Sequence, residues 1–236
     1  MIHQEAHMAL SLALITARGG SKRIPRKNIK PFLGKPIICY SIDAAIKSDV
    51  FDEIMVSTDD EEIAEISRIA GANVPFMRSS AASDDHASTD DVIAEVLNAY
   101  EAKGKHFDRF CCIYPTAPFI TPDKLRTAMQ LLDDAESVLP VVPFSYPPQR
   151  GMILNDKDEL RRRYPEYASS RSQDLEKFYH DCGQFYACRT DAFLRGKTTD
   201  VDNMIPMIMD ETEVQDIDNL SDWKIAELKY KLMEQR

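Results

Sequence analysis

Short apolar runs alternate with amphipathic stretches along the first 142 residues. Runs of strand length lie at residues 8–15, 54–57, 74–76, 110–114 and 137–142. Between the first two runs, Ile38, Ile42 and Ala45 recur at helical spacing. Strands that alternate with helices in this way predict an α/β fold, with a doubly wound, mostly parallel sheet.

Several sequence signals predict where the helices begin and end. Thr58-Asp59-Asp60 can cap a helix that Gly71 ends. Ser88 and Asp91 have the spacing of a capping box. Thr121-Pro122-Asp123 places a hydroxyl and a proline at the start of a further helix.

The pattern breaks between residues 143 and 177, where prolines and charged residues exclude a central strand. We expect an inserted subdomain at 143–177, with 1–142 and 178–236 forming one α/β core. Beyond the insertion, strand-like runs lie at 183–188, 204–209 and 214–218. A last helix should start near Ser221 and bury three apolar side chains, those of Ile225, Leu228 and Leu232.

Charge and composition narrow the function classes. The 236 residues carry a formal net charge of −10, which argues against a general nucleic-acid binder. No apolar run approaches the roughly 18 residues that span a bilayer, and residues 1–7 do not read as a leader, so no membrane partner and a cytoplasmic location are expected. The five cysteines form no CxxC pair and lie mostly in apolar runs, so buried, reduced thiols are expected.

The strongest candidate for chemistry is the loop 17–28, Ala-Arg-Gly-Gly-Ser-Lys-Arg-Ile-Pro-Arg-Lys-Asn, which follows the first predicted strand. Two glycines let the backbone turn so that several N–H groups can face one anion. Five cations lie within ten residues: Arg18, Lys22, Arg23, Arg26 and Lys27. The loop matches neither a Walker A motif nor Gly-x-Gly-x-x-Gly. It predicts a site for a small phosphate-bearing ligand such as a triphosphate.

A second candidate is Asp216-Ile217-Asp218. On a strand, both carboxylates would point to one face while Ile217 packs inward. Mg²⁺ is commonly held by one or two carboxylates together with substrate phosphates. An Asp-x-Asp alone is more typical of an exposed strand end than of a metal site, so the phosphate loop is what favours a metal site here.

Other polar segments can line a pocket. The loop 78–85 is polar, and the prolines of 114–118 can form a rigid wall at a strand end. Polar side chains around the insertion suit a hydroxylated, carboxylated sugar, although each alone is typical of a surface: Gln149, Arg150, Arg171, Asp181 and Gln184.

Four segments together, 17–28, 56–59 (Val-Ser-Thr-Asp), 114–118 (Tyr-Pro-Thr-Ala-Pro) and 215–218 (Gln-Asp-Ile-Asp), resemble the CMP-sugar synthetases, or acylneuraminate cytidylyltransferases. The loop 19–30 and the segments 146–150 and 171–176 most resemble the pseudaminic acid group of that family. Tyr114 stands where sialic acid enzymes tend to carry glutamine. Two positions depart from the pseudaminic pattern: Thr16 replaces a usual proline and Ala187 an expected tryptophan.

The resemblance implies a Rossmann-like, GT-A-like nucleotidyltransferase. Such an enzyme would use Mg²⁺ to convert CTP and a nonulosonic acid, most closely pseudaminic acid, into the CMP-sugar and pyrophosphate. The CMP-sugar would serve surface or flagellin glycosylation. It also implies that 1–142 and 178–236 bind the nucleotide. The insertion 143–177 would be a dimerisation segment of a homodimer and would reach the partner's sugar site.

Residue roles carry over from the matched motifs. The nucleotide would contact Ala17, Arg18, Gly19, Gly20, Ser21, Lys22, Asn28, Arg78 and Asp84. Catalytic roles fall to Arg18, Lys22 and Lys27, and metal binding to Asp216 and Asp218. The sugar would contact Tyr114, Thr116, Gln149, Arg150, Arg171 and Gln184. No residue of a matched motif stands out as a general base.

Two kinds of alternative stay open. An N-acetylneuraminic or legionaminic acid cytidylyltransferase would share the phosphate chemistry but not the sugar pocket. A 3-deoxy-manno-octulosonate enzyme fits less well, because its loop typically differs after the serine. A regulatory protein that binds nucleotide without turnover is the non-enzyme alternative, and the intact Arg18, Lys22, Asp216 and Asp218 argue against it.

Overall fold

The first buried run of the chain forms the strand around which the main sheet is built. The computed structural model describes residues 9–84 and 86–235. Within it, β1 (Ser11–Thr16) pairs in parallel with β4 (Glu53–Ser57) on one side and β5 (Arg109–Ile113) on the other. The expected start of this strand at residue 8, and the expectation for 1–7, fall outside the described residues.

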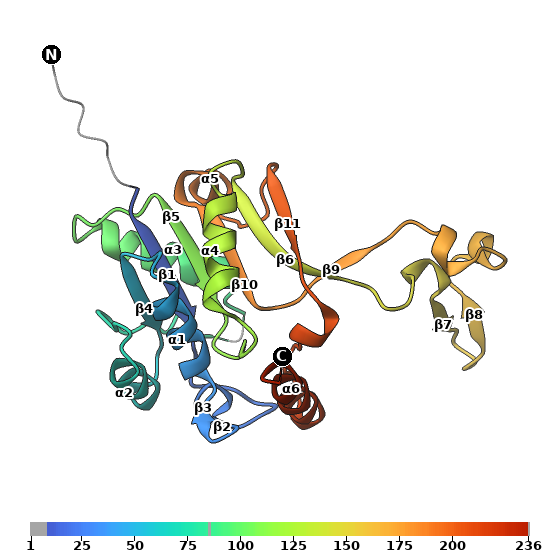
Figure 1. Cartoon of the computed structure of the whole chain (residues 1–236), viewed down its shortest axis with the longest axis horizontal. Helices are drawn as coiled ribbons and strands as arrows, with labels where there is room; N and C mark the ends of the chain where they lie inside the picture. Colours follow the sequence, from blue (N-terminus) through green and yellow to red (C-terminus); the bar gives the residue numbers. More distant parts are fainter. Residues whose placement is uncertain (1–8, 85, 236) are drawn as a thin grey trace, which may run out of the picture.

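The sheet has seven strands in the order β11-β6-β10-β5-β1-β4, with β9 pairing to β6 (Figure 1). Its remaining strands are β6 (Ser137–Pro143), β9 (Tyr179–Asp181), β10 (Phe185–Arg189) and β11 (Met204–Ile208). Two small hairpins lie outside it, β2 (Pro31–Phe32) with β3 (Lys35–Pro36) and β7 (Met152–Leu154) with β8 (Leu160–Arg162). The helices are α1 (Ile38–Ser48), α2 (Glu61–Ile69), α3 (Thr89–Glu101), α4 (Pro122–Leu131), α5 (Thr190–Gly196) and α6 (Leu220–Met233).

The α/β class is confirmed, and the sheet is mixed in direction. β1, β4 and β5 run parallel to one another, as does the pair β6 and β11. β10 lies antiparallel between β5 and β6, and β9 is antiparallel to β6. The chain returns from the insertion in the reverse direction, which the strand–helix alternation of the first 142 residues did not indicate.

Helices cover both faces of the sheet, as a doubly wound fold requires. On one face, Ala13, Ile15 and Ile113 pack with residues of α1 and α4. On the other, Leu12 and Leu14 pack with residues of α3 and α5. Alternate residues of β1 thus enter two separate cores, which explains why this strand reads as a continuous apolar run.

Two predicted strands are absent from their places. Residues 74–76 form no strand, and this region contributes only an isolated bridge between Met55 and Asn73. Residues 214–218 are irregular in structure rather than a paired strand. Ile217 is nevertheless buried, as predicted.

The inward face predicted for the last helix is wrong. Ile225, Leu228 and Leu232 are 44%, 63% and 56% exposed, whereas Trp223 and Ala226 are buried. The reason is an aromatic cluster in which the rings of Trp223 and Tyr230 both contact the ring of Phe32, with centroids 5.6 Å apart in each case. This tertiary contact decides which side of α6 faces the body.

Residues 144–178 form an arm that extends away from the sheet and carries the β7–β8 hairpin at its far part (Figure 1). Large apolar side chains on the arm are exposed, among them Met152, Ile153, Leu154, Leu160 and Tyr164. The arm therefore presents apolar surface that its own fold does not cover.

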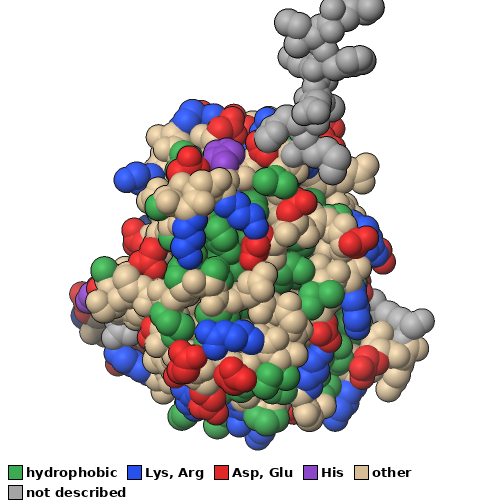
Figure 2. Space-filling model, turned by 90° about the vertical axis from the view of Figure 1, so that its left-hand side faces the viewer, with side chains coloured by type: hydrophobic (Ala, Val, Ile, Leu, Met, Phe, Trp, Pro, Cys, Tyr) green, Lys and Arg blue, Asp and Glu red, His purple; other side chains and the backbone are tan. Residues whose placement is uncertain are grey.

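The five thiols are buried and free, as predicted. Burial raises the pKa of Cys112, Cys182 and Cys188 to about 12 in each case. Within residues 9–84 and 86–235, none of the helices combines the length and apolar character that crossing a membrane requires. On the face shown in Figure 2, basic and acidic side chains are interspersed, which leaves that face without a strong field of one sign.

Candidate active site

A cavity of about 480 Å³ opens at the carboxyl ends of β1 and β5, where ligands of open α/β sheets bind. Thr16, the last residue of β1, and Tyr114, which follows β5, lie in its wall. The predicted site residues that line it are Arg18, Ser21, Lys22, Lys27, Asn28, Arg78, Asp84, Tyr114 and Thr116. Residues far apart in sequence thus meet at one cavity.

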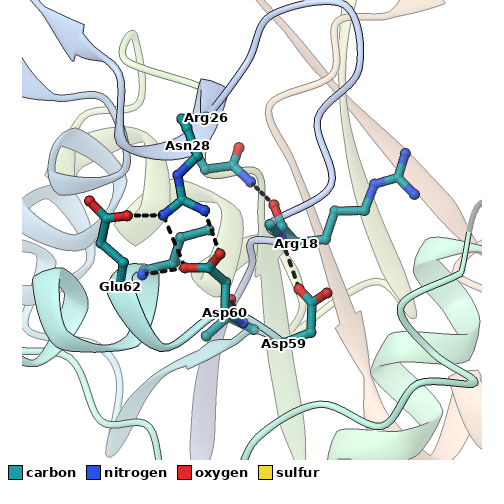
Figure 3. A network of polar contacts seen from close by, with 9 residues as sticks. Arg18, Arg26, Asn28, Asp59, Asp60 and Glu62 are labelled. Carbon is teal, nitrogen blue, oxygen red and sulfur yellow. Dashed lines mark hydrogen bonds and ion pairs between the residues drawn. The ribbon is translucent and has the colours of Figure 1, made fainter.

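The start of the basic loop is held by hydrogen bonds to its backbone (Figure 3). The N–H of Gly19 donates to Asp59 Oδ1 at 2.8 Å, and Asn28 Nδ2 donates to the carbonyl of Arg18 at 2.9 Å. These contacts satisfy main-chain groups on both sides of the turn, so the loop is shaped without a ligand. Asn28 was predicted to contact nucleotide; it lines the cavity, and it also holds the loop.

Arg26 ties the far side of the same loop to the start of α2. It adopts a left-handed backbone conformation with φ of 55°, and its guanidinium pairs with Asp60 and Glu62 (Figure 3). Asp60 also caps α2 by accepting from the N–H of Ile63 at 3.0 Å. The hydrogen bond from Arg26 lowers the pKa of Asp60. Arg26 therefore acts within the scaffold, and it does not line the cavity among the described residues.

Three cations of the cavity are placed by specific contacts. Arg18 Nη1 donates to the carbonyl of Asp84 at 3.3 Å. Arg78 is 8% exposed, donates through Nε to Ser57 Oγ at 2.9 Å, and has its pKa lowered by burial. Burial also lowers the pKa of Lys27, although attraction to two nearby carboxylates, those of Asp218 and Asp216, opposes the effect. An anion in the cavity would stabilise the charged forms of the buried Arg78 and the partly buried Lys27.

The carboxylates of Asp216 and Asp218 lie close to this cationic region. Lys27 Nζ donates to the carbonyl of Ile217 between them at 2.8 Å, and Arg23 Nη2 lies 2.6 Å from Asp218 Oδ1. Desolvation and the charge of Asp218 raise the pKa of Asp216, which is the effect expected of two carboxylates that share one region. Asp216 faces a second cavity of about 310 Å³, also lined by His180 and Asp181.

Asp216 and Asp218 fit a cation whose remaining ligands are oxygens of the substrate phosphates. No cluster of three or more metal-ligating His, Cys, Asp or Glu side chains occurs in residues 9–84 and 86–235. Mg²⁺ does not need such a cluster when phosphate oxygens supply the other ligands. Repulsion between Asp216 and Asp218 favours positive charge beside them, and Lys27 and Arg23 supply part of that charge.

Sequence reasoning missed the start of α3 as part of the cavity. Ser88, Thr89 and Val92 line it, and Thr89 Oγ1 lies 3.2 Å from the hydroxyl of Tyr114. The capping box of Ser88 and Asp91 is confirmed. It marked where the helix begins, but nothing in the local pattern showed that this end faces the basic loop.

Not all predicted sugar contacts converge on the cavity within this chain. Arg150 and Arg171 are exposed on the arm, where they contact Ser172 and Asp174. Gln149 is buried at the arm and donates to the carbonyl of Glu176. Gln184 is 1% exposed and donates to the carbonyl of Glu213, while its Oε1 has no hydrogen-bond partner among the described residues.

Among the predicted nucleotide contacts, Ala17, Gly19 and Gly20 do not line the cavity. Ala17 is fully buried, and its N–H donates to the carbonyl of Ser57 at 2.9 Å. These three residues shape the turn of the loop, while Ser21 and Lys22 lie in the cavity wall.

A family model described as cytidylyltransferase matches residues 12–215, which include the basic loop and the carboxyl ends of β1 and β5. The chain belongs to this cytidylyltransferase family. It is similar to the pseudaminic acid cytidylyltransferase of Campylobacter jejuni, with 39% identity over 224 residues that cover 94% of this chain and 97% of the relative. It is also similar to the CMP-N,N'-diacetyllegionaminic acid synthase of Legionella pneumophila, with 32% identity over 94% and 96% of the two chains.

Solved structures support the fold of this cytidylyltransferase family member. A CMP:2-keto-3-deoxy-manno-octonic acid synthetase complexed with CTP aligns with a TM-score of 0.66 at 18% identity, covering 97% of this chain and all of the other. The 4-diphosphocytidyl-2C-methyl-D-erythritol synthase of Anaerococcus prevotii aligns with a TM-score of 0.64 at 14% identity, over 94% and 99%. At these identities the likeness concerns the fold.

Proposed function

We propose that the protein transfers CMP from CTP to the anomeric hydroxyl of a nonulosonic acid, preferably pseudaminic acid, and releases pyrophosphate. The observation that carries this proposal is the cavity at the ends of β1 and β5, where a basic loop faces Tyr114 and lies beside an acidic pair. The 39% identity to the Campylobacter relative supports pseudaminic acid as the acceptor.

In this reaction the sugar hydroxyl attacks the α-phosphorus in line, the new P–O bond forms, and the bond to pyrophosphate breaks. Such a reaction depends on positioning and on charge neutralisation more than on covalent help from the protein. Arg18, Lys22 and Lys27 are the cations we assign to the triphosphate and the departing pyrophosphate. Ser21, Asn28, Arg78 and Asp84 are assigned to holding the nucleotide.

We assign Mg²⁺ to Asp216 and Asp218. When bound, the ion would neutralise phosphate charge and lower the pKa of the attacking hydroxyl. Lys27 lies against the backbone between the two carboxylates, so it links the metal side of the site to the phosphate side. Its partly buried ammonium is suited to the pyrophosphate that leaves.

We further propose a homodimer that forms through the arm. The exposed apolar side chains of the arm, such as Leu154 and Leu160, support this proposal. Dimerisation would also explain why Arg150 and Arg171 lie far from the cavity of their own chain: each would serve the partner's sugar site. Buried, reduced thiols and the use of CTP favour a cytoplasmic location.

A second acceptor, legionaminic or N-acetylneuraminic acid, is favoured by other similarities. The Legionella synthase is 32% identical, and the N-acylneuraminate cytidylyltransferase of Escherichia coli is 28% identical over 91% of this chain and 51% of its own length. These proteins share the family chemistry, so the sugar is the only point at which the two candidates differ.

The test is pyrophosphate release with CTP and Mg²⁺, with pseudaminic, legionaminic and N-acetylneuraminic acid offered separately. We expect the highest kcat/KM with pseudaminic acid. Lys22→Ala should lower turnover, whereas Lys47→Ala, at an exposed position on α1, should match the wild type. Release with another sugar alone would move the acceptor assignment. CTP binding without pyrophosphate release in the presence of any of the three sugars would favour a regulatory protein that binds nucleotide without turnover.

A further inference from the structure

A chain of hydroxyl groups leads from the cavity wall to a carboxylate outside it. The hydroxyl of Tyr114 donates to that of Tyr186 at 3.5 Å, and the hydroxyl of Tyr186 donates to Asp181 Oδ2. The two rings meet edge to face with centroids 5.6 Å apart. Tyr114 lines the large cavity, whereas Asp181 lines the second one, so the chain crosses the wall between them.

The direction of this chain follows from the chemistry of its end group. An ionised carboxylate can only accept hydrogen bonds. Asp181 accepts the hydrogen of Tyr186 through Oδ2 and the N–H of Gly183 through Oδ1 at 2.7 Å. With its hydrogen committed to Asp181, the hydroxyl of Tyr186 accepts from Tyr114, and the hydrogen of Tyr114 that is directed at Tyr186 points away from the cavity.

Both phenols keep their hydrogens in this arrangement. Burial raises the pKa of Tyr114 and of Tyr186. The Tyr114 oxygen therefore presents its lone pairs to the cavity. The hydroxyl of Thr89, 3.2 Å away, can also donate a hydrogen bond to them. An oxygen fixed in this way accepts a hydrogen bond and cannot offer one.

We propose that Tyr186 and Asp181 are positioning residues that hold Tyr114 as a hydrogen-bond acceptor, so that the site selects a sugar with a hydroxyl or amide N–H donor at this point. The inference rests on the proposed function, because it assigns Tyr114 to the sugar. It adds Tyr186 to the site and assigns to Asp181, which the sequence placed among side chains suited to a sugar, a role that reaches the sugar only through Tyr114.

Asp181→Asn provides a directional test. The N–H of Gly183 is an obligate donor, so it would hold the amide oxygen of the new side chain. The amide NH₂ would then donate to Tyr186, whose hydrogen would turn toward Tyr114, and the hydrogen of Tyr114 would point into the cavity. A nearly isosteric change should thus reverse the direction of the hydrogen bonds. The hydroxyl of Tyr114 would then face the donor group of the sugar with a hydrogen of its own.

The experiment measures KM for the sugar and for CTP separately. We expect Tyr186→Phe and Asp181→Asn each to raise the sugar KM about tenfold, the value of roughly one hydrogen bond, without changing the KM for CTP. In a Tyr114→Phe background, neither change should have a further effect, because the group they orient is gone. Tyr40→Phe is the matched control, since its hydroxyl is paired with the carbonyl of Phe32 away from the cavity.

Equal sugar KM values in wild type, Tyr186→Phe and Asp181→Asn would overturn the inference while leaving the proposed function in place. So would effects that persist unchanged in the Tyr114→Phe background, or a parallel rise in the KM for CTP, because both indicate general disturbance. Where a variant turns over too slowly, calorimetric titration with the sugar gives the same comparison. Absence of turnover by the wild type with every sugar would overturn the function and the inference together.

Discussion

The carboxylate of Asp59 accepts a 2.8 Å hydrogen bond from the backbone N–H of Gly19, which joins the end of β4 to the start of the basic loop. The next residue, Asp60, lies so close that a Cβ added to Gly19 would be 2.7 Å from its Oδ2. Gly20, the neighbouring residue, has no atom within 4 Å of such a position. Two adjacent glycines thus differ sharply in how much space they have.

We expect Gly19→Ala to raise the KM for CTP about tenfold and to destabilise the fold by about 1–3 kcal/mol, because Asp60 is held by Arg26 and by its cap of α2 and cannot easily move aside. Gly20→Ala should stay close to the wild type in both measurements. Steady-state kinetics and thermal unfolding check the pair. Equal behaviour of the two variants would show that the contact with Asp60 does not shape the loop.

The charge of Lys27 should be lost at a lower pH than that of an ordinary lysine. Burial lowers its pKa from the usual 10.5, so the neutral form gains population as the pH rises toward that value. If the ammonium binds triphosphate, kcat/KM for CTP, which reports the free enzyme, must fall over this alkaline range. Lys27→Arg keeps a positive charge there and should move the fall to higher pH. If the pH profiles of kcat/KM for the wild type and for Lys27→Arg coincide in the alkaline range, Lys27 does not have this role.

Asp216→Asn should raise the Mg²⁺ concentration needed for half-maximal activity by about tenfold or more, as expected when a metal site loses a charged ligand. The asparagine keeps the size of the side chain and removes its charge. Asp123→Asn, at an 87% exposed carboxylate on α4, is the matched control and should leave the Mg²⁺ dependence unchanged. An unchanged Mg²⁺ titration of Asp216→Asn would remove the metal from this residue.

The arm should control the oligomeric state. Leu154 and Leu160 face each other across the β7–β8 hairpin and are 62% and 64% exposed. We expect the double change Leu154→Asp with Leu160→Asp to convert a dimer, twice the chain mass of 26.8 kDa, to a monomer in light-scattering measurements. Leu228→Asp alters an equally exposed leucine on α6 and should leave the dimer intact. A wild-type monomer, or a dimer that survives the double change, would argue against the arm as the interface.

Much of the fold followed from local patterns because they reflect local physics. The apolar run of β1 and the helical spacing in α1 each arise from the burial of one element. The capping box of Ser88 and Asp91 is a contact between residues three apart. Where the outcome depended on a distant partner, prediction failed. The buried side of α6 is set by contacts of Trp223 and Tyr230 with Phe32, about 190 residues earlier in the chain.

The site shows the same division. The sequence could place the cations of the basic loop at the carboxyl end of a strand, because ligands of open α/β sheets bind there. Thr89 could not, since its meeting with Tyr114 depends on how α3 lies against β5. Asp59 was recognised as part of a helix-capping segment and of one motif that carries the family resemblance. Its hydrogen bond to Gly19 could not be foreseen, because it depends on the parallel pairing of β1 with β4.

The burial of all five cysteines has a practical consequence. Thiolates, not thiols, react with alkylating reagents, and a raised pKa keeps the buried sulfurs protonated at neutral pH. Each sulfur becomes reactive only when the segment around it opens. Cys112 lies in the central strand β5 and Cys39 in α1 near the surface of its core. Their labelling rates, resolved by mass spectrometry of peptides, would therefore compare how often two layers of the molecule come apart, without any engineered probe.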